Sequence, residues 1–238
     1  MTPQAIPLVC VADWTLEPDP PFGLLGPRER VHVLSLPAWR RTQWAAGRLT
    51  ARAAQLLALG AQRVASDVLV APDGAPLLVG GTGFLSIAHS RSLFACAVLG
   101  CPTPLGVDVE FDGRGVENLL PRIAAPGESP LPPMATRLWT AKEAALKACR
   151  AHPGRLNGYR VSLRSPETGT VQQAAHPTGD VLQVWFETLP GAVAAVVAPP
   201  GPARPRFLRV EGQDILDLLR TRASTRPRTE EETTCGVT

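Results

Sequence analysis

Two long helix-like segments, each accompanied by short strand-like runs, constrain the fold of this chain most. The first begins at Pro37 and stops before Gly60, which fits a helix of about 22 residues with proline in its first turn and glycine just past its end. The second covers residues 134–150. Because each helix has its own group of strands, this order predicts an α+β fold of two similar halves packed together.

Short apolar runs bounded by proline, glycine and aspartate mark the expected strands. Two of them frame a Pro-Asp-Gly turn within 67–79, and the pattern predicts a hairpin at 84–88 and 93–99. The remaining strands are expected at 6–12, 31–35, 104–111, 159–164, 181–187 and 192–198.

These elements suggest where the chain divides. We expect an N-terminal half at 1–103 and a C-terminal half at 104–200, with a Gly- and Pro-rich loop at 112–134. Residues 201–238 would add a short amphipathic helix within 212–222 and a disordered tail.

Composition narrows the class of protein. With 238 residues, of which 45% are hydrophobic, the chain can form one domain, or two small joined ones, with a sizeable core. Its longest apolar runs fall far below the ~20 residues that cross a bilayer, and the first residues lack the basic region of a signal peptide. Five cysteines without a C-x-x-C pair favour neither a disulfide framework nor a zinc site, so we expect a cytoplasmic protein.

The net charge of +3 is too small to indicate nucleic-acid binding. The proportion of lysine to arginine is more informative. Of the 24 lysine and arginine residues, only Lys142 and Lys147 are lysines. Lysine is a compact ammonium on a flexible stem, whereas arginine is a planar fork. The isolated pair therefore points to a site, although chance placement of two solubilising residues is the simpler alternative.

A strand with two carboxylates supplies the next candidate. In the segment GVDVE, Asp108 and Glu110 share one strand face, with Cα atoms roughly 6–7 Å apart, while Val107 and Val109 face the opposite side. Two close carboxylates raise each other's pKa, and Mg²⁺ is a natural partner because it favours carboxylates together with water and phosphate oxygens. The alternative is a half-exposed strand with two solvated acids.

Three further groups of residues are candidates for metal or phosphate binding. Glu143 and Lys147 lie one helical turn apart, which fits either a surface ion pair or a third metal oxygen beside a phosphate-binding ammonium. His89, in the segment SIAHS, is either a packed imidazole or a contact for phosphate or adenine. Arginines 41, 48 and 52 share one face of the first helix, which is either solvated or able to grip phosphates.

Taken in order, the segments WRRTQWAAGRLTAR, SIAHS, GVDVE and WTAKEAALKA resemble the 4′-phosphopantetheinyl transferases. The resemblance is to the larger monomeric type, which activates surfactin and enterobactin synthetases and related carrier proteins. That family has a G-[IV]-D-[IV]-E strand and a W-x-x-K-E-A-x-x-K helix, and both patterns are complete here. The match covers about residues 37–198 and includes both lysines.

The resemblance implies a fold of two similar α+β halves related by a pseudo-two-fold axis, with coenzyme A in the cleft between them. It implies a Mg²⁺-dependent transfer of phosphopantetheine to a serine of an apo acyl or peptidyl carrier protein, with release of 3′,5′-ADP. The implied Mg²⁺ ligands are Asp108, Glu110 and Glu143; the implied catalytic residues are Glu143 and Lys147; the implied coenzyme A contacts are Arg41, Arg48, Ser86, His89, Lys142 and Lys147. Whether Glu143 holds metal or accepts the serine proton stays open.

Some positions depart from the family pattern. Ala75 stands where the family often has the lysine of a Gly-Lys-Pro segment, which removes one nucleotide contact that Arg63 or Arg91 would have to replace. Ala88 replaces a serine. The segment 112–134, which contacts carrier protein in the family, lacks the usual aromatic residues.

Two other functions remain open from sequence. The chain could be a degenerate member that binds coenzyme A or carrier protein without catalysis, or a Mg²⁺-dependent phosphoesterase. Nucleic acid and membrane are not expected as partners, because the aligned arginines lack interleaved aromatics and no apolar segment is long enough. A single chain that holds both halves predicts a monomer.

Overall fold

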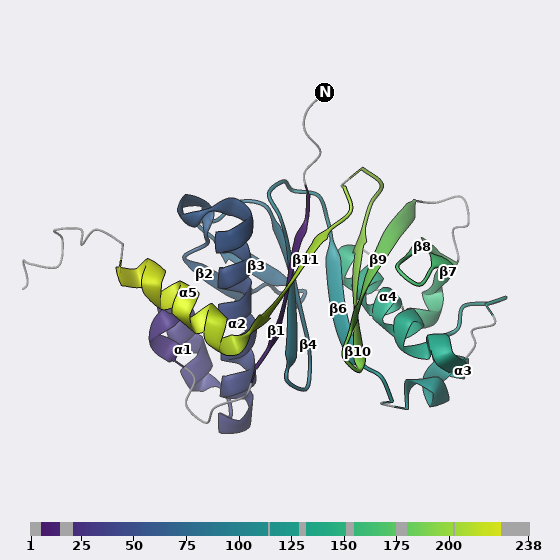
Figure 1. The fold of residues 1–238 in the computed structure, drawn as a ribbon, viewed down its shortest axis with the longest axis horizontal. Coiled ribbons are helices and arrows are strands. Elements are labelled where there is room, and N and C mark those ends of the chain that lie inside the picture. Colours follow the sequence, from purple (N-terminus) through teal and green to yellow (C-terminus); the bar gives the residue numbers. More distant parts are fainter. Residues whose placement is uncertain are drawn as a thin grey trace, which may run out of the picture.

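The computed structural model describes residues 6–14, 21–113, 115–128, 132–150, 155–174, 180–201 and 203–224. The fold is mixed α+β, and its main layers are a helix, a sheet, a second sheet and a second helix (Figure 1). Among these described residues, no helix is long and apolar enough to cross a membrane.

The first large sheet has the strand order β11-β1-β5-β4, and α2 (Ala38–Leu59) covers its outer face. Its strands are β1 (Leu8–Asp13), β4 (Phe84–Ser90), β5 (Leu93–Leu99) and β11 (Arg206–Glu211). Around α2 lie α1 (Pro27–Ser35), the hairpin of β2 (Asp67–Val70) and β3 (Pro76–Val79), and α5 (Gly212–Ser224). We call this assembly the N-terminal half.

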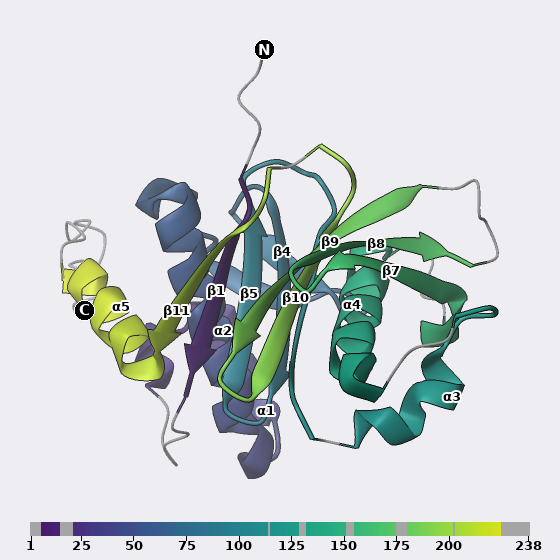
Figure 2. The ribbon, with the colours of Figure 1, turned by 45° about the vertical axis from the view of Figure 1, so that its right-hand side comes forward.

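The second large sheet is antiparallel throughout, with the order β6-β10-β9-β8-β7, and α4 (Ala135–Ala148) packs on its outer face (Figure 2). Its strands are β6 (Gly106–Phe111), β7 (Tyr159–Ser165), β8 (Thr168–Gln173), β9 (Val181–Leu189) and β10 (Ala192–Ala198). The short helix α3 (Leu120–Ile123) lies below α4. We call this assembly the C-terminal half. Single 3-10 turns are η1 (Phe22–Leu24), η2 (Ala61–Arg63), η3 (Val116–Leu119), η4 (Pro132–Met134) and η5 (Leu156–Gly158).

Alternation along the strands builds three hydrophobic cores. In β5, Phe94 and Cys96 face α2, whereas Ala95 and Ala97 face the other sheet. β10 divides its side chains in the same way between α4 and the first sheet. Because side chains of a strand point to alternate faces, one apolar strand serves two cores, and the two sheets join through a central core of small residues.

Most expected elements are present. The helix expected from Pro37 to Gly60 is α2, and the helix expected at 134–150 is α4. The predicted hairpins and the carboxylate-bearing strand are also confirmed.

One expected strand is wrong, because residues 31–35 belong to α1. A short apolar run favours a strand here, but contacts at the start of the helix decide otherwise. Asp67 accepts hydrogen bonds from the backbone N–H groups of Arg28 and Glu29, and Glu29 accepts one from Gly26. A distant residue therefore caps this helix, and local strand propensity is overridden.

Two strands were not expected. β8 is polar and owes its conformation to pairing with β7 and β9 on either side. β11 pairs in parallel with β1 from the far end of the chain, and α5 then packs against α2. The segment after residue 200 thus completes the N-terminal half rather than forming a separate appendage. The tail at 225–238 lies outside the described residues, and the expected loop at 112–134 contains η3 and α3.

Candidate functional site

The two halves meet where the edge strands β4 and β6 lie side by side. The hydroxyl Oγ of Ser86 on β4 accepts a hydrogen bond from the backbone N–H of Val107 on β6 at 3.1 Å. Val107 and Val109 are buried in the central core. Asp108 and Glu110 consequently lie on the opposite face of β6, the face that packs against α4, as the sequence predicts.

Asp108 is the most perturbed acid at this junction. Its Oδ1 accepts a hydrogen bond at 2.8 Å from Nζ of Lys147, which also donates to the carbonyl of Val107 at 3.1 Å. Burial raises the pKa of Asp108 to about 6; Lys147 opposes the rise, and the nearby carboxylates of Glu143 and Glu110 add to it. The three predicted metal ligands therefore lie close enough to interact electrostatically.

Glu110 is held by the neighbouring strand. Its Oε1 accepts hydrogen bonds from Oγ of Ser90 at 2.6 Å and from the backbone N–H of Phe111 at 2.9 Å. Ser90 was not expected at the site, although it closes the SIAHS segment and shares a strand face with Ser86. The i, i+4 spacing of Ser86 and Ser90, which places both on one strand face, was the signal by which the sequence could have identified Ser90.

The carboxylate oxygens of Asp108 and Glu110 are the type of ligand that a hard divalent cation prefers. Asp108 and Glu110 offer oxygen ligands on one strand face, and their mutual repulsion favours a bound cation. However, no group of three or more His, Cys, Asp or Glu side chains in the described part of the chain is arranged to hold a metal ion. The donor set thus fits Mg²⁺ with two carboxylates rather than with a preformed three-residue cluster.

His89 lies on the other face of β4 and is exposed. Its ring stacks on Phe94 with centroids 5.5 Å apart and an interplanar angle of 14°. Partial burial lowers its pKa from the usual range, the cations Lys147 and Arg40 lower it further, and Glu110 opposes them. Burial and the neighbouring cations therefore favour the neutral form of the imidazole. Arg40 is a neighbour that sequence reasoning missed.

Lys142 is not where it was expected. Its ammonium is fully buried and donates to Oε2 of Glu128 at 2.5 Å and to the carbonyl of Ile123 at 2.6 Å. Glu128 also accepts the backbone N–H groups of Ala125 and Val161. Burial lowers the pKa of Lys142, and Glu128 counteracts this. In place of the expected phosphate contact, Lys142 forms a buried ion pair that connects α4 with the loop after α3.

The arginines on one face of α2 also bond to other parts of the protein. Arg41 donates to the carbonyls of Leu34 and Leu36. Arg48 is buried, donates from Nε to the carbonyl of Val68 at 2.7 Å, and lies over the Trp44 ring, and burial lowers its pKa to about 10. The open phosphate-gripping face expected from the sequence is therefore not what the structure presents.

A pocket of about 260 Å³ opens between the halves beside this junction. Its lining comes from the β2–β3 turn, β4 and the end of α4, and it includes Ser86 and Lys147. Arg150 also lines it, donating from Nη2 to the carbonyl of Pro76 at 3.0 Å. Arg63 instead donates to Thr82 and Gly100. Arg150, which sequence reasoning did not identify, is a cation of the pocket that Ala75 also lines.

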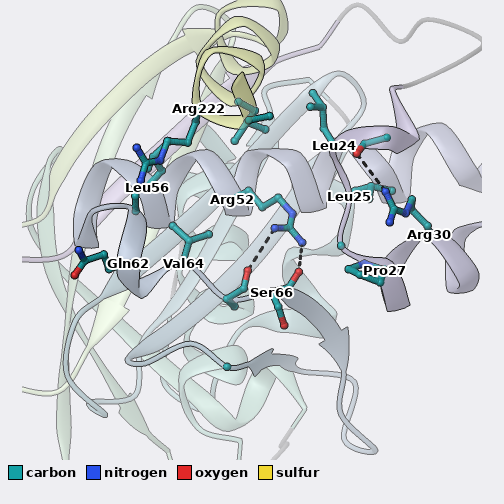
Figure 3. A pocket seen from close by; sticks show the side chains of 17 residues that line it. Leu24, Leu25, Pro27, Arg30, Arg52, Leu56, Gln62, Val64, Ser66 and Arg222 are labelled. Atoms are coloured by element: carbon teal, nitrogen blue, oxygen red, sulfur yellow. Dashed lines mark hydrogen bonds between the residues drawn. The ribbon is translucent and has the colours of Figure 1, made fainter. Parts of the chain in front are cut away.

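A larger cavity of about 700 Å³ lies on the far side of the N-terminal half, between α1, α2 and α5 (Figure 3). Arg52 donates there to the carbonyl of Ser66, and Arg30 to the carbonyl of Gly23. Among the motif residues only Arg52 lines this cavity, and Glu29 already neutralises it. The motif residues therefore favour the smaller pocket between the halves as the functional site.

No protein-family model matches this chain, and no curated protein matches it at a significant level. The geometry of the β4–β6 junction is therefore the observation from which function must be inferred.

Proposed function

We propose that this protein transfers 4′-phosphopantetheine from coenzyme A to a serine of an apo acyl or peptidyl carrier protein. One observation carries the proposal: segments far apart in sequence meet at one junction. Lys147 of α4 contacts Asp108 of β6, and Ser90 of β4 contacts Glu110 of β6. These are the residues of the strand, helix and SIAHS motifs whose order resembles that family.

The two halves support the finer fold assignment. Each has one long helix, α2 or α4, on the outer face of a sheet, and the inner faces of the sheets meet in the central core. We propose that the halves are related by a pseudo-two-fold axis, with coenzyme A at their junction. The nucleoside end would enter the pocket beside Ser86, and the pyrophosphate would approach Lys147.

The reaction is a phosphoryl transfer in which the serine Oγ attacks the β-phosphorus of coenzyme A. A new P–O bond to serine forms, and the bond to the departing 3′,5′-ADP breaks. Lys147 stabilises charge on the leaving group, and Glu143, which is half-buried on α4, accepts the serine proton. Mg²⁺ held by Asp108 and Glu110 would neutralise pyrophosphate oxygens.

The remaining proposals follow from this activity. The protein would act as a cytoplasmic monomer whose partners are coenzyme A and a carrier protein, and neither nucleic acid nor membrane would be required.

Intact-mass spectrometry tests the activity directly. An apo carrier protein incubated with this protein, coenzyme A and Mg²⁺ should gain the mass of phosphopantetheine, and EDTA should abolish the gain. A Ser→Ala carrier protein is the matched control. Release of 3′,5′-ADP without any carrier protein would identify a phosphoesterase instead. Coenzyme A binding without transfer to peptidyl or acyl carriers would identify a degenerate binding protein.

A further inference from the structure

Arg150 joins the two halves at the pocket between them. It lies just beyond the end of α4 in the C-terminal half, and its Nη2 donates to the carbonyl of Pro76 in the N-terminal half at 3.0 Å. Its guanidinium carbon lies 4.7 Å from the centroid of the Phe84 ring. A planar cation is therefore held over an aromatic ring at the rim of a pocket.

The charged groups of this pocket already have protein partners. Asp73 accepts the backbone N–H of Ala75 at 3.0 Å within its own turn. Lys147 donates to Asp108 and to the carbonyl of Val107, at the carboxylate side of the junction. Arg150 is the third charged group, and it is bonded to Pro76. The two cations of the pocket therefore have different partners: Lys147 is bonded to a carboxylate of β6, and Arg150 to a carbonyl of β3.

Most of the remaining lining is apolar. Phe84, Ile87 and Leu146 contribute large apolar side chains to it, and Ser86 contributes a hydroxyl. A volume of about 260 Å³ suits a flat heterocycle rather than a flexible chain with several charges. Every nucleobase has a π-face, and guanidinium planes and aromatic rings are the side chains on which bases stack.

We propose that Arg150, backed by Phe84, forms the platform on which the adenine base of coenzyme A stacks. This inference rests on the proposed function and assigns to Arg150 a role that none of the sequence motifs covers. The Phe84 ring supports one face of the guanidinium, and the base covers the other. Because Arg150 also bonds to Pro76, base binding contacts both halves at once.

Isothermal titration of the full chain with adenosine 3′,5′-bisphosphate tests the platform. Arg150→Leu removes both plane and charge, whereas Arg150→Lys keeps the charge and removes the plane. Both should weaken binding by about 5–100-fold, the range for a lost base stack, and the loss in Arg150→Lys, which keeps the charge, should be the same at low and high salt. Arg137→Leu is the matched control, because Arg137 lies near the other end of α4 and bonds to Pro166 and Thr188.

Coenzyme A and 3′-dephospho-coenzyme A separate a base contact from a phosphate contact. Stacking predicts that Arg150→Leu weakens both ligands by the same factor. Wild-type affinity in Arg150→Lys, or a loss confined to ligands with the 3′-phosphate, would overturn the proposal. Thermal unfolding without ligand identifies a variant that fails to fold, and Phe84→Leu then supplies a second test of the same platform.

The same titrations separate this inference from the proposed function. Arg150-dependent nucleotide binding without phosphopantetheine transfer would overturn the function and leave the base platform standing. Transfer by the wild type, with unchanged nucleotide affinity in every Arg150 variant, would leave the function standing and remove the platform.

Discussion

Glu29 in the N-terminal half and Asp108 at the junction are both buried carboxylates paired with a cation, yet their surroundings differ. Both oxygens of Glu29 accept hydrogen bonds: Oε2 from Arg52 at 2.5 Å and from Gly26 at 2.6 Å, and Oε1 from Val68 at 2.8 Å. Asp108 is bonded through Oδ1 to Lys147, whose side chain is 32% exposed. Burial raises the pKa of Asp108, and two neighbouring carboxylates add to the rise.

The difference separates a fully bonded, buried ion pair from one whose cation is partly exposed. A carboxylate with every oxygen bonded holds three chain segments in place and has nothing left to offer a ligand. A carboxylate with a raised pKa beside a half-exposed ammonium is poised to exchange partners. The C-terminal half contains both kinds, since Lys142 and Glu128 form a closed pair on the same helix that carries Lys147.

The largest effect is expected at Glu143. Replacing it with Gln removes the proposed base while keeping size and hydrogen-bonding capacity, so transfer should fall by about 10²–10⁴-fold. Coenzyme A binding and thermal stability should stay near wild type. The measurement is the initial rate of carrier-protein modification by intact mass, and unchanged turnover would remove Glu143 from the mechanism.

Replacing each lysine by Met tests directly whether the Lys142–Glu128 and Lys147–Asp108 pairs differ in their roles. Lys142→Met strands the buried Glu128 and should lower the free energy of unfolding by about 3–5 kcal/mol. Lys147→Met should cost less stability than Lys142→Met, because the Lys147 ammonium is partly exposed, but it should lower the transfer rate about 100-fold, because in the proposed mechanism this ammonium stabilises the leaving group. Urea unfolding and the mass assay measure the two quantities, and exchanged phenotypes would contradict the distinction between closed and open pairs.

Asp108 should make stability depend on pH in an unusual direction. Its pKa is about 6 in the folded protein against an ordinary 3.8, so the folded state holds the proton more tightly. This contribution stabilises the protein at low pH and is lost as pH rises from about 4 through 6. In EDTA, Asp108→Asn should therefore raise the free energy of unfolding at pH 7 by about 1–3 kcal/mol, and by little near pH 4. A gain that is the same at both pH values would contradict the raised pKa.

The smallest effect is expected at an exposed pair away from the junction. Arg204 donates to Glu167 at 2.7 Å, and both side chains are exposed. Arg204→Gln should change the free energy of unfolding by less than about 0.5 kcal/mol and leave transfer unchanged. A larger loss in urea unfolding would show that exposure alone does not separate weak pairs from structural ones.

Local patterns predicted the elements that bury their own stripe of side chains. The helices α2 and α4 were readable from spacing, proline and glycine, and the face of β6 that carries Asp108 followed from two-residue alternation. The strands β8 and β11 were not readable, because a polar strand between two partners and a parallel strand added from the far end of the chain depend on pairing rather than on their own residues.

The sequence by itself determined the mixed fold, the two long helices and the motif residues Asp108, Glu110, Glu143 and Lys147. Only the tertiary structure decided that Lys142 is buried against Glu128 while Lys147 remains partly exposed beside Asp108. The same is true of the contact between Arg150 and Pro76 of the other half. The reason is physical: spacing along a helix places a charge on a face, but whether that charge is free depends on which distant carboxylate or carbonyl the fold brings to it.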